Sequence, residues 1–165
     1  MLKVPLEIVV PIYNEGKKVL ELLDQFQVFI KTKFRVLLCY DSDDDNIFDY
    51  KNDLQKYSCE VHLVKNSSTG PSEAIKKGLY YGKSDCVIVY PADDFLNIKI
   101  IDDMYKAYTE SNDIVVASRF MKGGSMKGCP LIKEILARTA SATLYFFSSI
   151  PVKDASNGFR LFSRK

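Results

Sequence analysis

The sequence predicts an α/β domain in which helices cover both faces of a mostly parallel sheet. Short apolar, β-branched runs alternate with segments of helical period along the whole chain. The run 85–90 is apolar almost without interruption, as expected of a central strand in a parallel sheet. Because crossovers between parallel strands are right-handed, the helices should lie on both sides of the sheet.

Each expected strand is a short apolar run with a clear end. The run 6–10 stops at Pro11, and the run 34–40 passes directly into the acidic loop 41–45. The expected strands, in chain order, are residues 6–10, 34–40, 60–64, 85–90 and 113–117.

Apolar residues three and four positions apart mark the helices between these strands. Gly70 and Pro71 favour a helix start, because a proline in the first turn gives up an N–H that would have no partner there. The expected helical segments, in chain order, are residues 15–29, 47–57, 70–80, 98–108 and 132–147. The tail 153–165 shows no clear element.

The composition indicates a globular domain and excludes several classes of protein. A chain of 165 residues fits one domain, or one domain cut short. Apolar residues make up 47% and charged residues 27%, and the net charge of +2 argues against a nucleic-acid partner.

The four scattered cysteines are typical of a reducing compartment rather than of disulfides or zinc. Pro5 and Glu7 interrupt the N-terminal segment, so no signal peptide is expected, and no run reaches the roughly 20 apolar residues of a membrane span.

Charged side chains gather at the carboxyl ends of the expected strands, where ligands bind in parallel α/β sheets. The loop 41–45 has acids at its first, third and fifth positions, as a calcium loop does, but the positions that need glycine and glutamate both hold asparagine. A solvated acidic turn is therefore the better interpretation for Asp43 and Asp44. Asp41 directly follows a buried strand, so we expect it to point into the cleft.

Asp93 and Asp94 follow the most apolar strand. Two adjacent carboxylates are costly to desolvate there unless a cation meets them, and a magnesium or manganese ion on a diphosphate is one such cation. Capping of the helix that starts near Asn97 is an equally good interpretation. Arg119 and Arg160 could likewise bind phosphate through paired hydrogen bonds, or lie on the surface.

Together these segments resemble the family 2 glycosyltransferases of the GT-A fold, and within them the polyprenyl-phosphate sugar transferases of the dolichyl-phosphate mannose synthase type. They occur in the family's order and spacing and cover nearly the whole chain. The resemblance implies one GT-A domain over residues 1–165, truncated at its C-terminal end: a Rossmann-like three-layer sandwich with a mostly parallel central sheet. The segments that carry it are 9–15, Asp41 with Asp45, 70–78, 90–94, 117–120 with Gly123 and Gly124, and 154–160.

The resemblance implies a role for each matching residue. Asp93 would hold a divalent metal, Mg²⁺ or Mn²⁺, on the diphosphate of the donor, with Asp94 as a second ligand. Arg119 would face either the phosphates of the donor or the phosphate of the acceptor. The implied nucleotide-binding residues are Pro11, Ile12, Tyr13, Glu15, Asp41, Gly70, Ala92 and Asp93. The implied acceptor-binding residues are Ser156, Asn157 and Arg160, and the implied catalytic residues are Asp93, Asp94, Arg119 and Asp154.

The implied activity is an inverting transfer of a sugar from a nucleoside-diphosphate sugar to an acceptor, foremost a polyprenyl phosphate, with a glycan as the other candidate. A lipid phosphate is already anionic and needs no general base, whereas a hydroxyl acceptor requires one, for which Asp154 is the candidate. The helix 132–147 either lies against a membrane surface or packs on the sheet. The protein is accordingly expected in the cytoplasm, or peripherally at the cytoplasmic face of a membrane, in cell envelope glycan synthesis.

Three positions depart from the family's pattern. Pro91 replaces the first Asp of the Asp-x-Asp motif, Phe95 stands where Gln is frequent, and Asn157 stands where Ser is usual. Two expected metal ligands are therefore absent, so either Asp94 substitutes for them or metal binding is weak or absent. This favours a second hypothesis: a GT-A module that binds nucleotide sugars with weak or no catalysis. A signalling receiver domain is disfavoured, because residues 11–15 lack the paired acids that receivers place after the first strand.

Overall fold

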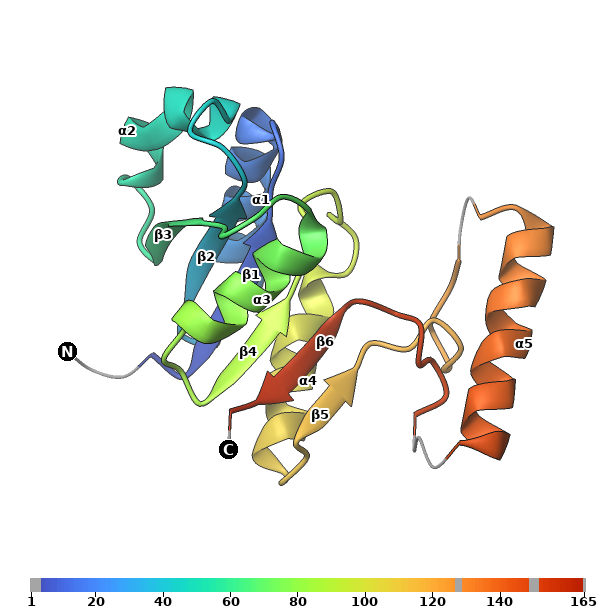
Figure 1. The fold of residues 1–165 in the computed structure, drawn as a ribbon. Helices are drawn as coiled ribbons and strands as arrows, with labels where there is room; N and C mark the ends of the chain where they lie inside the picture. The colour runs from blue at the N-terminus through green and yellow to red at the C-terminus, as the bar shows by residue number, and fades with distance from the viewer. Residues whose placement is uncertain (1–3, 127–128, 149–151, 165) are drawn as a thin grey trace.

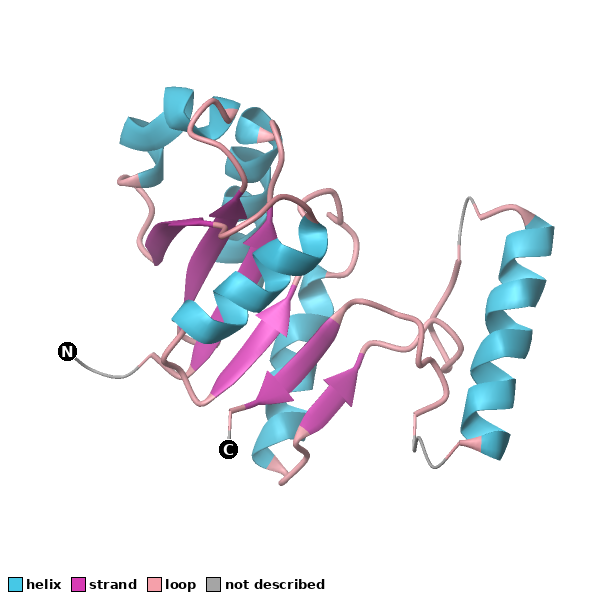
Figure 2. Ribbon diagram, in the orientation of Figure 1, coloured by secondary structure: helices cyan, strands magenta, loops and turns pink. Residues whose placement is uncertain are grey.

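A six-stranded sheet forms the middle layer of the protein (Figures 1 and 2). The computed structural model describes residues 4–126, 129–148 and 152–164. The strands are β1 (Leu6–Pro11), β2 (Phe34–Tyr40), β3 (Glu60–Lys65), β4 (Cys86–Val89), β5 (Ile114–Val116) and β6 (Arg160–Ser163). The helices are α1 (Gly16–Phe29), α2 (Lys51–Leu54), α3 (Pro71–Tyr81), α4 (Ile101–Thr109) and α5 (Leu131–Phe147), with the 3-10 turns η1 (Asn46–Tyr50) and η2 (Ile98–Ile100).

The strands lie in the order β3-β2-β1-β4-β6-β5. β1 pairs in parallel with β2 and β4, and β2 pairs in parallel with β3, whereas β6 pairs antiparallel with both β4 and β5. The predicted α/β class and mostly parallel sheet are therefore confirmed. The strand order changes direction between β1 and β4, which is where ligands bind in open sheets of this kind.

The prediction that the tail 153–165 has no regular element was wrong, because residues 160–163 form β6. Arg160 lies opposite Val89 of β4 and Val116 of β5. The strand has four residues and only Leu161 is buried, so its local pattern is weak. Its stability comes from pairing with a strand on each side, which is a property of the tertiary fold rather than of the segment.

Helices cover both faces of the sheet, as predicted. Figure 1 shows α3 in front of the sheet and α4 behind it. Alternate residues of β1 point to opposite faces, so Ile8 and Val10 join the larger core with α1 while Val9 joins the smaller core with α3. A side chain at position 78 would collide with Val9, so Gly78 allows α3 to approach β1 closely.

A buried ion cluster ties together the end of the sheet opposite the carboxyl ends of the parallel strands. Glu7 is fully buried and accepts hydrogen bonds from Arg35 (2.6 Å), from Arg164 (2.8 Å) and from the amide of Lys83 (2.8 Å). Burial alone would raise the pKa of Glu7, but the Lys83 amide and the two guanidinium groups lower it below its usual value. The cluster joins β1 to β2 and to the segment that follows β6.

α5 lies beside the sheet rather than on it (Figure 1). Ser141 is the only buried residue among those described in α5, and Ile132, Phe146 and Phe147 are 73%, 76% and 88% exposed. The alternative that this helix packs on the sheet is therefore wrong. None of the helices in the described ranges is long and apolar enough to cross a bilayer.

Candidate functional site

The candidate site lies along the carboxyl ends of β1 to β4, which the parallel pairing brings to one edge of the sheet. Pro11 ends β1, and Glu15 precedes α1; both are half-buried at this edge. The loops that follow β2, β3 and β4 carry the other residues that the sequence singles out. On the other side of β4, two more segments lie at this edge of the sheet. One follows β5 and the other precedes β6.

The loop after β1 presents Tyr13 to solvent, at 69% exposure. The side chain of Ile12 is buried in the core, so this residue can offer a ligand only its backbone. Asn14 has a left-handed backbone, with φ of 55°. The buried carboxylate of Asp45 stabilises that conformation, because it accepts a hydrogen bond from the Asn14 amide at 2.8 Å and another from the Ile47 amide at 2.9 Å.

Asp41 joins the end of β2 to the end of β3 and the start of α3. One carboxylate oxygen accepts a hydrogen bond from Nδ2 of Asn66 at 2.7 Å, and the other accepts from the amide of Gly70 at 3.0 Å. Gly70 has φ of 108°, a conformation that favours glycine. Asp43 and Asp44 are exposed, as expected of a solvated turn.

Asn66 lies at the candidate site, and sequence reasoning assigned it no role there. It is 8% exposed, and its Oδ1 has no hydrogen-bond partner within the described part of the chain. A buried carbonyl without a partner is costly, so a ligand N–H would be a favourable partner for it. Its position directly after β3, one strand along from Asp41, was the signal that could have identified it.

Asp94 stabilises the turn after β4. Its Oδ1 accepts hydrogen bonds from the amides of Leu96 (2.9 Å) and Asn97 (3.1 Å), and its Oδ2 accepts from the Asn97 side chain (2.6 Å). These bonds close the turn that precedes η2. They do not cap the helix, because the N-cap position is held by Asn97, which makes no side-chain capping hydrogen bond with the described residues, so the capping interpretation was wrong. Asp93 is exposed and makes no hydrogen bond or ion pair with the described residues, and Ala92 is buried.

These contacts decide how a divalent metal fits. The described ranges contain no group of three or more side chains of the kinds that hold a metal ion. Mg²⁺ and Mn²⁺ are often held by one or two carboxylates together with substrate phosphates. Asp93 is a free carboxylate that suits this arrangement, whereas both oxygens of Asp94 are already engaged. The residues fit a metal that arrives with a diphosphate better than one bound by protein groups alone.

The buried Asp154 and the partly exposed Arg119 form a clamp between the segment that follows β5 and the segment that precedes β6. The fully buried Asp154 carboxylate accepts hydrogen bonds from the amide (2.9 Å), Nε (2.9 Å) and Nη2 (2.7 Å) of Arg119. Arg119 Nη2 also donates to Oγ of Ser156 at 2.7 Å. Burial raises the pKa of Asp154, but the hydrogen bonds and charge of Arg119 lower it more, so the pKa lies below its usual value. A carboxylate in this state is a weak base.

The segment that precedes β6 packs against the loop after β4. Phe159 contacts Tyr90 edge to face, with ring centroids 4.8 Å apart, and Tyr90 donates a hydrogen bond to the carbonyl of Asp94. Asn157 bonds the Ala117 carbonyl and the Phe159 amide, so its side chain is engaged within the loop. Arg160 donates to the carbonyls of residues 155 and 157 and pairs with no carboxylate in the described ranges. Its positive charge is therefore not neutralised there.

A family model matches residues 7–165 of the chain, under the description glycosyl transferase family 2. The chain belongs to this family. Two curated relatives illustrate the similarity: a dolichol-phosphate mannosyltransferase of Pyrococcus furiosus is 23% identical over 135 residues, and a dolichyl-phosphate beta-glucosyltransferase of Trichomonas vaginalis is 21% identical over 172 residues. The alignments cover 81% and 95% of this chain but 38% and 51% of those proteins. This chain thus spans about half of the length of these relatives or less.

A solved structure supports the same assignment at the level of the fold. The glucosyl-3-phosphoglycerate synthase of Mycobacterium tuberculosis, in complex with Mn²⁺, UDP-glucose and phosphoglyceric acid, has a TM-score of 0.62 with this chain. The match covers 96% of this chain and 56% of that one, at 16% identity. The expected GT-A fold is confirmed.

Proposed function

We propose that this family 2 chain transfers a sugar, with inversion, from a nucleoside-diphosphate sugar to a polyprenyl phosphate. The observation that carries the proposal is the packing of residues 90–94 against residues 154–160 through the Tyr90–Phe159 contact. A free carboxylate, Asp93, and an arginine held by a buried carboxylate thereby share one edge of the sheet. The two dolichyl-phosphate relatives support the acceptor class.

The donor would lie across the carboxyl ends of β1, β2 and β3. The unpartnered Oδ1 of Asn66 can accept a hydrogen bond from a base N–H, beside the Asp41 carboxylate. The exposed ring of Tyr13 offers a surface for the base or the ribose. Asp93 would hold Mg²⁺ or Mn²⁺ on the diphosphate, and that ion would help neutralise the charge of the leaving group.

The chemistry needs no general base when the acceptor is a phosphate. An acceptor oxygen attacks the anomeric carbon while the bond from that carbon to the diphosphate breaks, and the nucleoside diphosphate leaves with the bonding electrons. Because the acceptor oxygen is already anionic, no proton has to be removed. The low pKa and full engagement of Asp154 agree with this scheme: we infer that Asp154 positions Arg119 rather than accepting a proton. A lipid acceptor would place the reaction at the cytoplasmic face of a membrane.

The rival function is a module that binds nucleotide sugars with weak or no turnover. Pro91 in place of a carboxylate and the engagement of Asp94 favour it, since they leave Asp93 as the one free carboxylate of the loop. Both functions require the donor site, so binding of the donor does not distinguish them. Catalytic turnover does, because only the transferase should show it at an appreciable rate.

A calorimetric titration tests the donor site. Uridine and guanosine diphosphates and their sugars are titrated with and without Mn²⁺ into wild type, Asp93→Asn and the control Asp103→Asn, which neutralises an exposed carboxylate on α4. We expect micromolar binding of one base, with a Mn²⁺ dependence that Asp93→Asn removes and Asp103→Asn keeps. Failure of folded wild type to bind any of these nucleotides would contradict both functions. Binding without transfer to any prenyl phosphate would favour the module.

A further inference from the structure

One side chain, that of Asn46, joins the loop after β1 to the loop after β2. Its Nδ2 donates a hydrogen bond to the carbonyl of Asn14 at 3.0 Å, and its Oδ1 accepts one from the amide of Gly16 at 2.8 Å. The backbone amide of Asn46 donates in turn to Oδ1 of Asn14 at 3.3 Å. Because a carbonyl accepts and an amide N–H donates, both partners require the same orientation of the Asn46 side chain.

Helix α1 obtains an N-terminal hydrogen-bond acceptor from this contact. The first amides of a helix have no partner within it, and the N-cap residue, Glu15, makes no side-chain capping bond with the described residues. Asn46 supplies an acceptor from 30 residues further along the chain. A Cβ on Gly16 would lie 2.8 Å from the Asn46 carbonyl oxygen and 2.7 Å from the Tyr50 ring. The start of α1 and the segment 46–50 therefore fit together closely.

These bonds fix the spacing of the two segments that we place against the base of the donor. Tyr13 directly precedes Asn14, and Asp41 begins the acidic turn that Asn46 follows. A backbone hydrogen bond closes that turn, and the carboxylate of Asp45 accepts from the Asn14 amide. The Tyr13 side chain is largely exposed, so the backbone of its loop decides where its ring lies.

We propose that Asn46 is a positioning residue for the donor, which holds Tyr13 at the spacing from Asp41 that the base requires. The two loops are then ordered before the nucleoside diphosphate arrives, so binding does not carry the entropy cost of ordering them. Asn46 acts through Asn14 and not by contact with the donor. The inference rests on the proposed function and deepens it, since it traces donor affinity to a residue outside the base contacts.

Asn46→Asp separates this role from a structural one. The new carboxylate can still accept from the Gly16 amide, and a negative charge is favourable at the N-terminus of a helix. It cannot donate to the Asn14 carbonyl, so one of the bonds that hold the Tyr13 loop is lost. The matched control is Asn52→Asp, which makes the same change at an exposed asparagine of α2.

Calorimetry, transfer to farnesyl phosphate and urea unfolding are the readouts. In Asn46→Asp, Kd for the nucleoside diphosphate that wild type binds should rise about tenfold, through the lost hydrogen bond and the loop that must now be ordered. Both kcat at saturating donor and the unfolding midpoint should stay close to wild type, because the reacting groups and the acceptor for α1 are kept. In Asn52→Asp, Kd should stay within about twofold of wild type.

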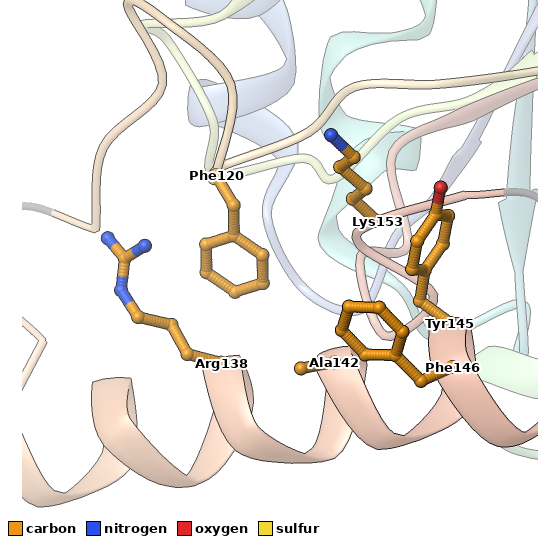
Figure 3. Close-up of a pocket in the computed structure, with 6 residues that line it drawn as sticks. All are labelled: Phe120, Arg138, Ala142, Tyr145, Phe146 and Lys153. Atoms are coloured by element: carbon orange, nitrogen blue, oxygen red, sulfur yellow. The ribbon is translucent and has the colours of Figure 1, made fainter.

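The segments beside β5 and β6 provide an internal reference, because they lie on the other side of β4 from Asn46. A cavity of about 310 Å³ lies there against α5, with Phe120 and Lys153 in its lining (Figure 3). Residues 11–50 are all described, and none of them contributes to this lining. A change confined to the two loops should leave the surroundings of Arg119 unaltered, and KM for farnesyl phosphate with them. A rise in this KM would indicate a general loss of structure and overturn the positioning role.

A fluorescent reporter in the loop tests its order directly. The chain has no tryptophan, so Tyr13→Trp adds a single one. In that background Asn46→Asp should lower the fluorescence anisotropy, and saturating nucleoside diphosphate should restore it. An unchanged Kd or an unchanged anisotropy in Asn46→Asp would overturn the positioning role and leave the proposed function standing. Failure of folded wild type to bind any nucleoside diphosphate would overturn the donor site, and this role with it.

Discussion

Replacement of Asp154 by Asn tests the clamp that joins the donor and acceptor sides of the site. The variant keeps the size of the side chain but removes the charge that three groups of Arg119 contact. Removing one partner of a buried ion pair costs about 3–5 kcal/mol. Arg119 keeps 28% of its side chain exposed, so water partly compensates its charge. We therefore expect the free energy of unfolding to fall by about 3 kcal/mol, the low end of that range. With a urea m-value of about 2 kcal/mol/M, the unfolding midpoint should fall by about 1.5 M.

The pH dependence of this loss follows from the lowered pKa of Asp154. A carboxyl whose folded pKa is depressed contributes its stability above the unfolded pKa of about 3.9, and this contribution is lost as pH falls through the folded pKa. The difference between wild type and Asp154→Asn should therefore be constant from about pH 5 to pH 8 and shrink below about pH 4. Glu7 titrates in the same window in both proteins, so it cancels in the difference.

Urea unfolding at several pH values is the assay, combined with transfer kinetics. Because the two side chains act as a unit, Arg119→Ala, Asp154→Asn and the double variant should lose similar amounts of kcat. A result that would refute the reasoning is an Asp154→Asn protein as stable as wild type that loses most of its kcat. Asp154 would then act on the acceptor as a base rather than on Arg119.

Three further substitutions test other parts of the account. Asn66→Ala should raise Kd for the nucleoside diphosphate about tenfold by calorimetry, since it removes a base contact, and an unchanged Kd would contradict that contact. Asp94→Ala should cost about 1 kcal/mol in urea unfolding because the turn loses the hydrogen bonds to Asp94, while Mn²⁺ dependence persists; loss of that dependence would show that Asp94 is a metal ligand. Glu7→Gln should lower stability at pH 7 by about 3 kcal/mol and remove part of the acid-sensitivity of unfolding between about pH 5 and pH 2; equal acid sensitivity would argue against a depressed pKa for Glu7.

The elements with a strong local period could be predicted from the sequence, and those defined by tertiary pairing could not. The runs that become β1, β2 and β4 are buried on both faces and were clear as apolar segments. β6 has four residues and one buried side chain, and it exists because β4 and β5 lie on either side of it. The length of α5 was predicted to within a residue, but an apolar pattern cannot say whether a helix packs on the sheet.

The edge of the candidate site was predictable because parallel strands end together. What each residue does there depends on its neighbours across the fold. Asp94 was open between metal binding and helix capping, and its bonds to Leu96 and Asn97 show that it stabilises a turn instead. The pairing of Asp154 with Arg119 joins residues 35 apart, and the unpartnered carbonyl of Asn66 is a property of burial alone. The local sequence shows neither the ion pair nor the missing hydrogen-bond partner, although it does place Asn66 at the end of β3.

The configuration of the product tests the central claim most directly. Wild type is incubated with the nucleotide sugar that binds, an α-linked donor, together with Mn²⁺ and farnesyl phosphate, and the product is isolated and examined by NMR. The account predicts a β-linked sugar on the lipid phosphate, because a single in-line displacement inverts the anomeric carbon. An α-linked product, or a sugar found only on water or on a hydroxyl acceptor, would contradict it.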